Sequence, residues 1–260
     1  MAKPNHGSSV RDFVHQQQDA RVEGEPRGIG PQVSEFARTK DAEPPPPPVD
    51  FEDGVITVVK DEGGTESFTT FADALAYADD GDTLQVGAGT YAEAFDLDEN
   101  VAIVGEAGAV IDGSGIAVSA GTQATIELFD GFSGGSISGL KIVAVDGGGA
   151  VQTIIGEAIS DVTLSDNVLD AGENTAGSLV YLNPDATGFV FDGNTFEGAA
   201  LTDSPLLGIE GDDVQVLNNT FGVTPGEYAK VEVFEGADGT TDDVVFTTNT
   251  GLGPTDIVFG

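Results

Sequence analysis

The chain has 260 residues and no cysteine, which excludes disulfide bonds, thiolate metal ligands and cysteine nucleophiles. Its formal net charge is −36, and residues 51–260 carry −34 of it, because 37 acidic residues there face three lysines. So few cations cannot neutralise phosphates, which excludes nucleic-acid binding. No apolar run approaches a membrane-spanning length and the N-terminus lacks a secretory signal, so we expect no membrane insertion and synthesis in the cytoplasm.

Residues 1–43 are predicted to form an extended anchoring arm with short helices. The segments SSVRDFVHQQQDAR and SEFARTKDA carry apolar residues at helical spacing, but neither can bury enough surface to fold alone. All four arginines and both histidines of the chain lie in the first 40 residues, which carry a formal charge of +1. The residues predicted to anchor this arm to a partner are Val10, Arg11, Phe13, Val14, Arg21, Arg27, Phe36 and Arg38.

Residues 44–50 are predicted to be a linker, because Pro44 to Pro48 are five consecutive prolines. In the polyproline II conformation they make a semi-rigid spacer of about 15 Å. A stiff spacer between a mildly basic arm and an acidic body favours tethering at a distance.

The body, residues 51–260, is predicted to begin with a strand, GVITVVK, followed by one helix. Thr70 and Asp73 form a variant of the capping box, which predicts a helix that begins at Thr70 and ends at Gly81. Its apolar face comprises Phe71, Ala74, Leu75 and Ala78. Beyond Gly81 the sequence shows short Val, Ile, Leu and Phe strands separated by Gly, Asp and Asn, which is typical of an all-β fold.

Five of these strands align without gaps: SISGLKIV (136–143), VTLSDNVL (162–169), FVFDGNTF (189–196), VQVLNNTF (214–221) and VVFTTNTG (244–251). The repeat interval is close to 27 residues, which indicates a solenoid of stacked parallel coils. Two apolar residues, two positions apart, precede each turn and are predicted to point inward. The turn amides are predicted to stack as a structural asparagine ladder of Asn167, Asn194, Asn219 and Asn249, with Leu140 at the first position.

The segment FADALAYADDGDTLQVGAGTYAEAFDLDENVAIVGEAGAVIDGSG closely resembles the opening module of the pectate-lyase-like superfamily. In that superfamily a helix caps the first coil of a right-handed parallel β-helix, and asparagine turns form an internal ladder. The resemblance covers residues 52–260 and implies an all-β, single-stranded right-handed parallel β-helix with an N-terminal capping helix, preceded here by the extended arm. Such folds serve lyases, hydrolases, phage tailspikes and adhesins, so the fold does not determine the function.

Catalytic residues are not predicted. Lyases of the superfamily use an arginine or lysine base, but residues 51–260 contain no arginine, and Lys141 and Lys230 have no basic neighbours. Hydrolases of the superfamily combine aspartates with histidine and arginine, which the body lacks, so we interpret Asp212 and Asp213 as coincidental. A glycosidase needs only two carboxylates, which 37 acidic residues make feasible without identifying the pair. Four tyrosines and no tryptophan argue against an aromatic glycan-binding groove.

The negative charge needs screening, because like charges repel one another in a compact body. A saline environment and bound Ca²⁺ both remain open. No other cofactor is expected, and no metal-binding residue is predicted because no acidic cluster has EF-hand spacing. The clusters are Asp79/Asp80, Asp96/Asp98/Glu99, Asp212/Asp213 and Asp242/Asp243.

The leading hypothesis is a non-enzymatic virion accessory protein of a bacteriophage: a capsid decoration, head fibre or spike made in the host cytoplasm. The arm would bind the major capsid protein or another virion protein and display the acidic β-helix. The alternative is a carboxylate-dependent polysaccharide depolymerase or a glycan-binding, tailspike-like protein. A homotrimer and a host-surface glycan as ligand stay open, and a salt-adapted or calcium-loaded surface adhesin is a third hypothesis.

Overall fold

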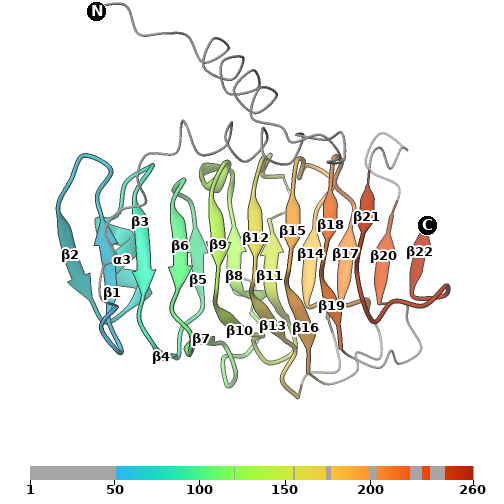
Figure 1. The fold of residues 1–260 in the computed structure, drawn as a ribbon, viewed down its shortest axis with the longest axis horizontal. Coiled ribbons are helices and arrows are strands. Elements are labelled where there is room, and N and C mark those ends of the chain that lie inside the picture. The colour runs from blue at the N-terminus through green and yellow to red at the C-terminus, as the bar shows by residue number, and fades with distance from the viewer. Residues whose placement is uncertain are drawn as a thin grey trace, which may run out of the picture. The chain divides into compact units, whose positions relative to one another are not determined.

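The structure is a computed structural model that describes residues 51–119, 121–154, 156–173, 177–198, 204–222, 230–234 and 244–259 (Figure 1). The predicted arm and linker therefore lie outside the described residues. Among those described, no helix is long and apolar enough to cross a membrane.

The body winds through three sheets, here called A, B and C; each described coil contributes one strand to each sheet, except the last, which contributes strands to sheets A and C. Sheet A contains, in spatial order, β2 (Thr65–Phe68), β1 (Ile56–Val59), β3 (Thr83–Val86), β6 (Ala102–Gly105), β9 (Ser136–Ser138), β12 (Thr163–Ser165), β15 (Val190–Asp192), β18 (Gln215–Leu217) and β21 (Val245–Thr247). Sheet B contains β4 (Gly89–Tyr91), β7 (Ala109–Asp112), β10 (Lys141–Val143), β13 (Val168–Asp170), β16 (Thr195–Glu197) and β19 (Thr220–Phe221). Sheet C contains β5 (Phe95–Leu97), β8 (Ala124–Leu128), β11 (Gly149–Thr153), β14 (Val180–Leu182), β17 (Leu207–Ile209), β20 (Val231–Val233) and β22 (Ile257–Phe259).

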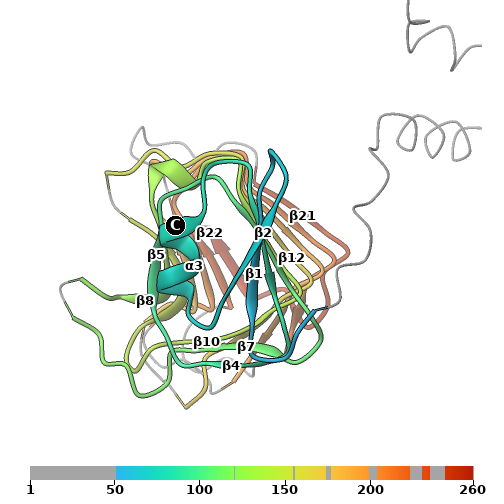
Figure 2. The same cartoon turned by 90° about the vertical axis from the view of Figure 1, so that its left-hand side faces the viewer.

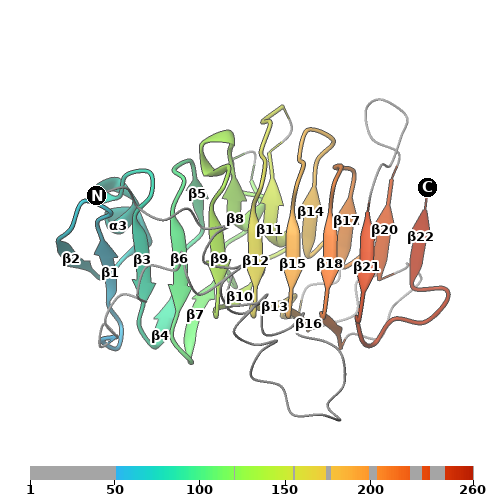
Figure 3. The same ribbon diagram turned by 45° about the horizontal axis from the view of Figure 1, so that its top comes forward.

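Pairings among β3 to β22 are parallel, and the strands of each sheet follow one another along the long axis in chain order (Figures 1 and 3). The predicted fold class, an all-β right-handed parallel β-helix, is confirmed. The repeated strands of the alignment are β9, β12, β15, β18 and β21, which are consecutive in sheet A.

The interior is filled by the apolar residues that the alternation of each strand turns inward. Leu164 pairs with Phe191, and Phe191 with Val216, so equivalent residues stack from coil to coil. The rings of Phe196 and Phe221 lie parallel at 4.5 Å. Each fully buried side chain of this size contributes about 1.5–3 kcal/mol. The last predicted inward pair, Val244 and Phe246, is only partly buried.

A short helix and a hairpin close the N-terminal end of the coils. Helix α3 (Phe71–Tyr77) begins as predicted, because the side chain of Thr70 accepts a hydrogen bond from the amide of Asp73. Phe71 stacks on Phe95 of the first coil at 4.5 Å. In the view along the axis on which the coils stack, α3 and β1 lie in front of the coils (Figure 2). Strand β1 pairs antiparallel with β2 and β3, so β3 is not an open edge.

The predicted end of the helix at Gly81 is wrong, because α3 ends at Tyr77. Ala78 is extended, with φ −69° and ψ 152°. The amide of Asp79 then donates to Asp82 Oδ2 at 2.7 Å rather than to a helical carbonyl. The contacts of Asp82 therefore end the helix at Tyr77, although the apolar pattern in the sequence continues to Ala78.

The corner between sheets A and B has one residue with positive φ in each of the five coils that contain the aligned repeat. That residue immediately precedes the predicted ladder position, and glycine or a short polar residue occupies it in most coils. In the last coil it is a β-branched threonine, which is strained in this conformation. The five residues are Gly139, Asp166, Gly193, Asn218 and Thr248, with φ between 54° and 71°.

Replacing Thr248 by glycine is expected to raise the free energy of unfolding by about 0.5–1 kcal/mol. The substitution relieves the left-handed strain of a β-branched residue, and this gain exceeds the entropic cost of glycine. Chemical denaturation measures the change. As a control, glycine at Thr247, an extended residue of β21, should destabilise. A loss of stability in Thr248→Gly would contradict the assignment of strain.

Candidate functional site

The four predicted ladder asparagines lie in one file at the corner between sheets A and B. Asn167 Nδ2 donates to Asn194 Oδ1 at 3.1 Å, Asn194 Nδ2 to Asn219 Oδ1 at 3.1 Å, and Asn219 Nδ2 to Asn249 Oδ1 at 3.2 Å. Each Nδ2 also donates to a backbone carbonyl, as Asn194 does to Leu164 at 2.8 Å. At the first position the amide of Leu140 donates to Asn167 Oδ1. The first three side chains are fully buried, so this file is structural and inaccessible to a ligand.

The other residues singled out in the sequence are the arm residues and the acidic clusters. The eight arm residues, from Val10 to Arg38, lie outside the described residues. Among those described, no group of three or more acidic or histidine side chains is arranged to hold a metal ion. Asp242 and Asp243 lie outside the described residues, so that cluster stays untested.

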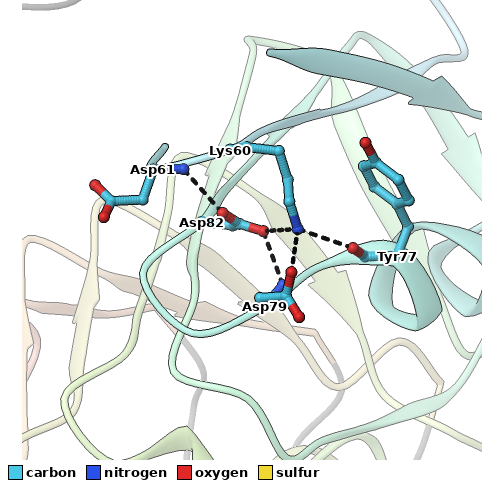
Figure 4. A network of polar contacts seen from close by, with 5 residues as sticks. All are labelled: Lys60, Asp61, Tyr77, Asp79 and Asp82. Carbon is cyan, nitrogen blue, oxygen red and sulfur yellow. Dashed lines mark hydrogen bonds and ion pairs between the residues drawn. The ribbon is translucent and has the colours of Figure 1, made fainter. Parts of the chain in front are cut away.

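Every lysine of the body is engaged with acidic side chains. Lys60 Nζ lies 2.6 Å from Asp79 Oδ2 and 2.6 Å from Asp82 Oδ2 (Figure 4). It also donates to the carbonyl of Tyr77 at 3.0 Å, at the C-terminal end of α3, where a cation is favourable. This lysine, which directly follows β1, therefore ties that turn to the end of α3 and to the residue before β3, which makes it a structural residue of the N-terminal cap.

Lys141 and Lys230 are engaged in the same way. Lys141 Nζ lies 2.7 Å from Asp170 Oδ2 and 3.0 Å from Glu197 Oε1, and these hydrogen bonds raise the pKa of Lys141. Lys230 is buried and donates to the carbonyl of Gly251, with Asp256 at 3.7 Å. Residues 51–260 contain no arginine or histidine, so the body has no unpaired cation.

Asp82 is the buried acceptor at the centre of the cap. Its side chain is 3% exposed and accepts hydrogen bonds from Lys60 Nζ, from the amide of Asp79 and, at 2.9 Å, from the amide of Asp61. Burial by itself raises the pKa of Asp82, but the hydrogen bonds from Lys60 and from the two amides outweigh it and hold the pKa below its usual value. The ionised form of Asp82 therefore stabilises the folded cap.

Replacing Asp82 by asparagine is expected to lower the free energy of unfolding at pH 7 by about 2 kcal/mol, because the charged acceptor of Lys60 is lost. The contribution of an aspartate with a lowered pKa is present above its unfolded pKa of about 4 and is lost as the pH falls through its folded pKa. The deficit of the variant should therefore shrink in acid. Asp79→Asn is the matched control, since Asp79 is 82% exposed and should matter little. Equal deficits at pH 7 and in acid would contradict this role.

Besides a cavity of about 340 Å³ at the N-terminal cap, lined by Lys60 and the acidic residues around it, two cavities lie on the flanks of the coils. The larger, of about 550 Å³, lies over sheet B and is lined by the Lys141 ion pairs and by further acidic residues, among them Asp112, Asp146 and Glu173. The second, here called the sheet C cavity, has about 330 Å³ and is lined by Gln123, Gln152, Thr153, Ile154 and Tyr181. The sheet C cavity combines amides, a hydroxyl and an aromatic ring, the kinds of groups that orient a polar ligand.

A row of polar side chains crosses the outer face of sheet C next to this cavity. In the strand register Asp96 pairs with Glu127, Glu127 with Gln152, and Gln152 with Tyr181. Ile126 and Leu128 point into the core, so Glu127 between them points outward. Asp96 and Glu127 are therefore side by side on adjacent strands, which lie about 4.8 Å apart.

The two carboxylates differ in their surroundings. Glu127 is 5% exposed, and its Oε1 accepts a hydrogen bond from the amide of Gln123. Asp96 is more exposed, and its pKa is raised, first by partial burial and then by the charges of Glu127 and Asp98. A pair of neighbouring carboxyl groups in different environments is the arrangement that divides acid and base roles between them.

Tyr181 occupies the same row, one strand beyond Gln152. The next residue of the row is Gly208, where an added Cβ would lie 3.0 Å from Tyr181 Cδ2, so glycine leaves room for the ring. Burial raises the pKa of Tyr181, and so does its hydrogen bond to Glu210. The tyrosine thus stays protonated at neutral pH, with its one O–H donated to Glu210, so the ring face and the oxygen lone pairs are what it offers to a ligand.

The row on sheet C was missed by the sequence analysis. Asp96 appeared there only within an acidic cluster considered for calcium, and Glu127, Gln152 and Tyr181 had no assigned role. The intervals between the four row residues are 31, 25 and 29 residues, as their register shows, so they form no sequence repeat. The alternation of inward and outward residues along the strands of sheet C is the signal that could have identified these side chains as neighbours on its outer face.

No protein-family model matches the chain, and no curated protein matches it. Two solved structures of the pectin methylesterase from Aspergillus niger, in a deglycosylated and a penultimately deglycosylated form, are similar. Each has 16% sequence identity and a TM-score of 0.37, and the match covers 77% of this chain and 87% of that chain. At this level of identity the likeness concerns the fold alone.

Proposed function

We propose that residues 51–260 form a carbohydrate-active domain that binds and hydrolyses a glycan on the outer face of sheet C. The observation that carries this proposal is the register of Asp96 with Glu127, which sets two carboxyl groups side by side next to the sheet C cavity. Hydrolysis of a glycosidic bond needs two such groups and no metal or cofactor.

The two carboxyl groups have distinct proposed roles. Asp96 is the general acid, because its raised pKa favours the protonated form that can donate to a leaving oxygen. Glu127 is the carboxylate that acts as nucleophile or base, held in place by the amide of Gln123. A separation near that of adjacent strands, about 5 Å, is the one used by retaining glycosidases.

Gln152 and Tyr181 are proposed to position the sugar. Both line the sheet C cavity and continue the row that begins with the carboxyl pair. The amide can donate to and accept from hydroxyl groups, while the aromatic ring offers an apolar surface with a polar tip. The cavity therefore supplies binding groups beside the reacting groups.

Release of new reducing ends tests this proposal. The full chain is incubated with oligosaccharides of neutral, amine-bearing and uronic-acid types, at low and at molar salt, and reducing ends are quantified over time. We expect release from at least one type, with retention of the anomeric configuration by proton NMR. No release and no binding across the panel would overturn the proposal.

The virion-accessory hypothesis is retained as a second proposal, and it depends on residues 1–50, which the structure does not describe. Deleting residues 1–50 is expected to abolish incorporation into particles while the body stays folded, because the proposed anchor is lost. Co-sedimentation with particles and circular dichroism measure the two effects. A truncated chain that still co-sediments would contradict the tether.

A further inference from the structure

We infer that the outer face of sheet C selects glycans by charge: it excludes chains that carry carboxylates or sulfates and binds amine-bearing chains more tightly than neutral ones. This inference takes the location of the binding face from the proposed function. It goes beyond that proposal because it names the class of substrate.

The described part of sheet C offers no cationic partner to an anionic sugar. A protein that binds uronates needs a cation at the site, and the body has three lysines to offer. Lys60 is bound to Asp79 and Asp82, Lys141 lies on sheet B between Asp170 and Glu197, and Lys230 is directed to the backbone of Gly251. None of the three lines the sheet C cavity.

The charged side chains of the row lie mainly toward its two ends. Beyond Gly208 the register continues to Glu232 of β20. The row therefore has two carboxyl groups at its start, Gln152 and Tyr181 in its middle with the carboxylate of Glu210 bonded to the tyrosine, and a further carboxylate at its far end. Five strand intervals of about 4.8 Å separate Asp96 from Glu232, which makes the row about 24 Å long. A linear glycan laid along it meets negative charge at both ends.

Opposite charges a few ångströms apart near a protein surface attract, and like charges repel, by enough to change affinity about tenfold or more. The body's net charge acts in the same direction but is spread over the whole surface, so it does not by itself place the ligand on sheet C. Both effects weaken as salt is added, since the Debye length falls from about 10 Å at 0.1 M to about 3 Å at 1 M.

Equilibrium binding of the full chain to three labelled hexasaccharides tests the inference: a glucose, a glucosamine and a glucuronic-acid hexamer, each with EDTA present. We expect the glucosamine hexamer to bind about tenfold more tightly than the glucose hexamer at low salt, and the glucuronic-acid hexamer to bind more weakly than either. A glucuronic-acid hexamer that binds as tightly as the glucose hexamer would overturn the inference and leave the proposed function standing. Failure of all three to bind would instead overturn the proposed function.

Two charge-matched variants locate the effect. Glu232→Gln removes the carboxylate at the far end of the row, and Glu66→Gln removes an exposed carboxylate from β2 on sheet A. The preference for glucosamine over glucose should fall severalfold in Glu232→Gln and stay unchanged in Glu66→Gln. Equal preferences in the two variants would show a general surface attraction and would overturn the assignment to sheet C.

Discussion

Replacing Glu127 by glutamine is expected to lower the rate of glycan hydrolysis by about 10²–10⁴-fold, because a neutral amide cannot serve as nucleophile or base. The side chain is almost fully buried on its strand, and glutamine keeps its shape and can still accept from the amide of Gln123. The loss should therefore be in kcat, with little change in the affinity for a neutral glycan. Initial rates of reducing-end release measure it.

The matched variant Asp96→Asn should lose activity for a different reason. Asp96 must be protonated to act as the acid, so wild-type activity should fall as the pH rises through its raised pKa, and the variant should lack that descending limb. Glu66→Gln, on β2 far from the row in sequence and on another sheet, serves as the control for loss of one negative charge. Retained activity in both Glu127→Gln and Asp96→Asn would show that the reaction does not use this pair.

Replacing Asn194 by leucine is expected to lower the free energy of unfolding by about 4 kcal/mol. Asn194 Oδ1 accepts from both the backbone amide and the Nδ2 of Asn167, at 3.0 Å and 3.1 Å. Its Nδ2 donates to the carbonyl of Leu164 and to Asn219 Oδ1. Leucine has a similar size but leaves these buried groups without partners, and each such group costs about 1–3 kcal/mol.

The neighbouring corner provides the control for this variant. Asn218 is exposed, has φ 56°, and occupies the position that is glycine at Gly139 and Gly193 in other coils. Asn218→Gly should therefore change the stability by less than about 1 kcal/mol. Urea unfolding, followed by circular dichroism, compares the two. Equal and small effects would mean that the file of amides contributes little to stability.

Much of the fold could be predicted because the part of each coil that passes from sheet A to sheet B has nearly constant length. Inward apolar residues, a turn and an asparagine recur together there, so Asn167, Asn194 and Asn219 could be aligned before any coordinates were known. The start of α3 could be predicted equally well, since Thr70 and Asp73 are three residues apart and interact locally. The end of α3 was not, because Asp82, which accepts from the amide of Asp79, is held in place by Lys60 and Asp61 from the turn after β1.

The candidate site could not be predicted from a regular spacing in the sequence. The segments that lead to and from sheet C vary in length, so its outward residues have no fixed spacing in the sequence. Lys141 and Glu197 are 56 residues apart and yet bonded, which shows how stacking joins distant positions. That the body is acidic and poor in cations followed from the sequence alone.

Local patterns therefore determined the coils, the asparagine file, the capping helix and the charge of this protein, because each depends on residues close together in the chain or on simple counts. Only the tertiary structure decided which acidic residues become neighbours and which lysines are occupied. The physical reason is that the stacking register places residues side by side across strands that lie 25 to 31 positions apart, as it does for Asp96, Glu127 and Gln152.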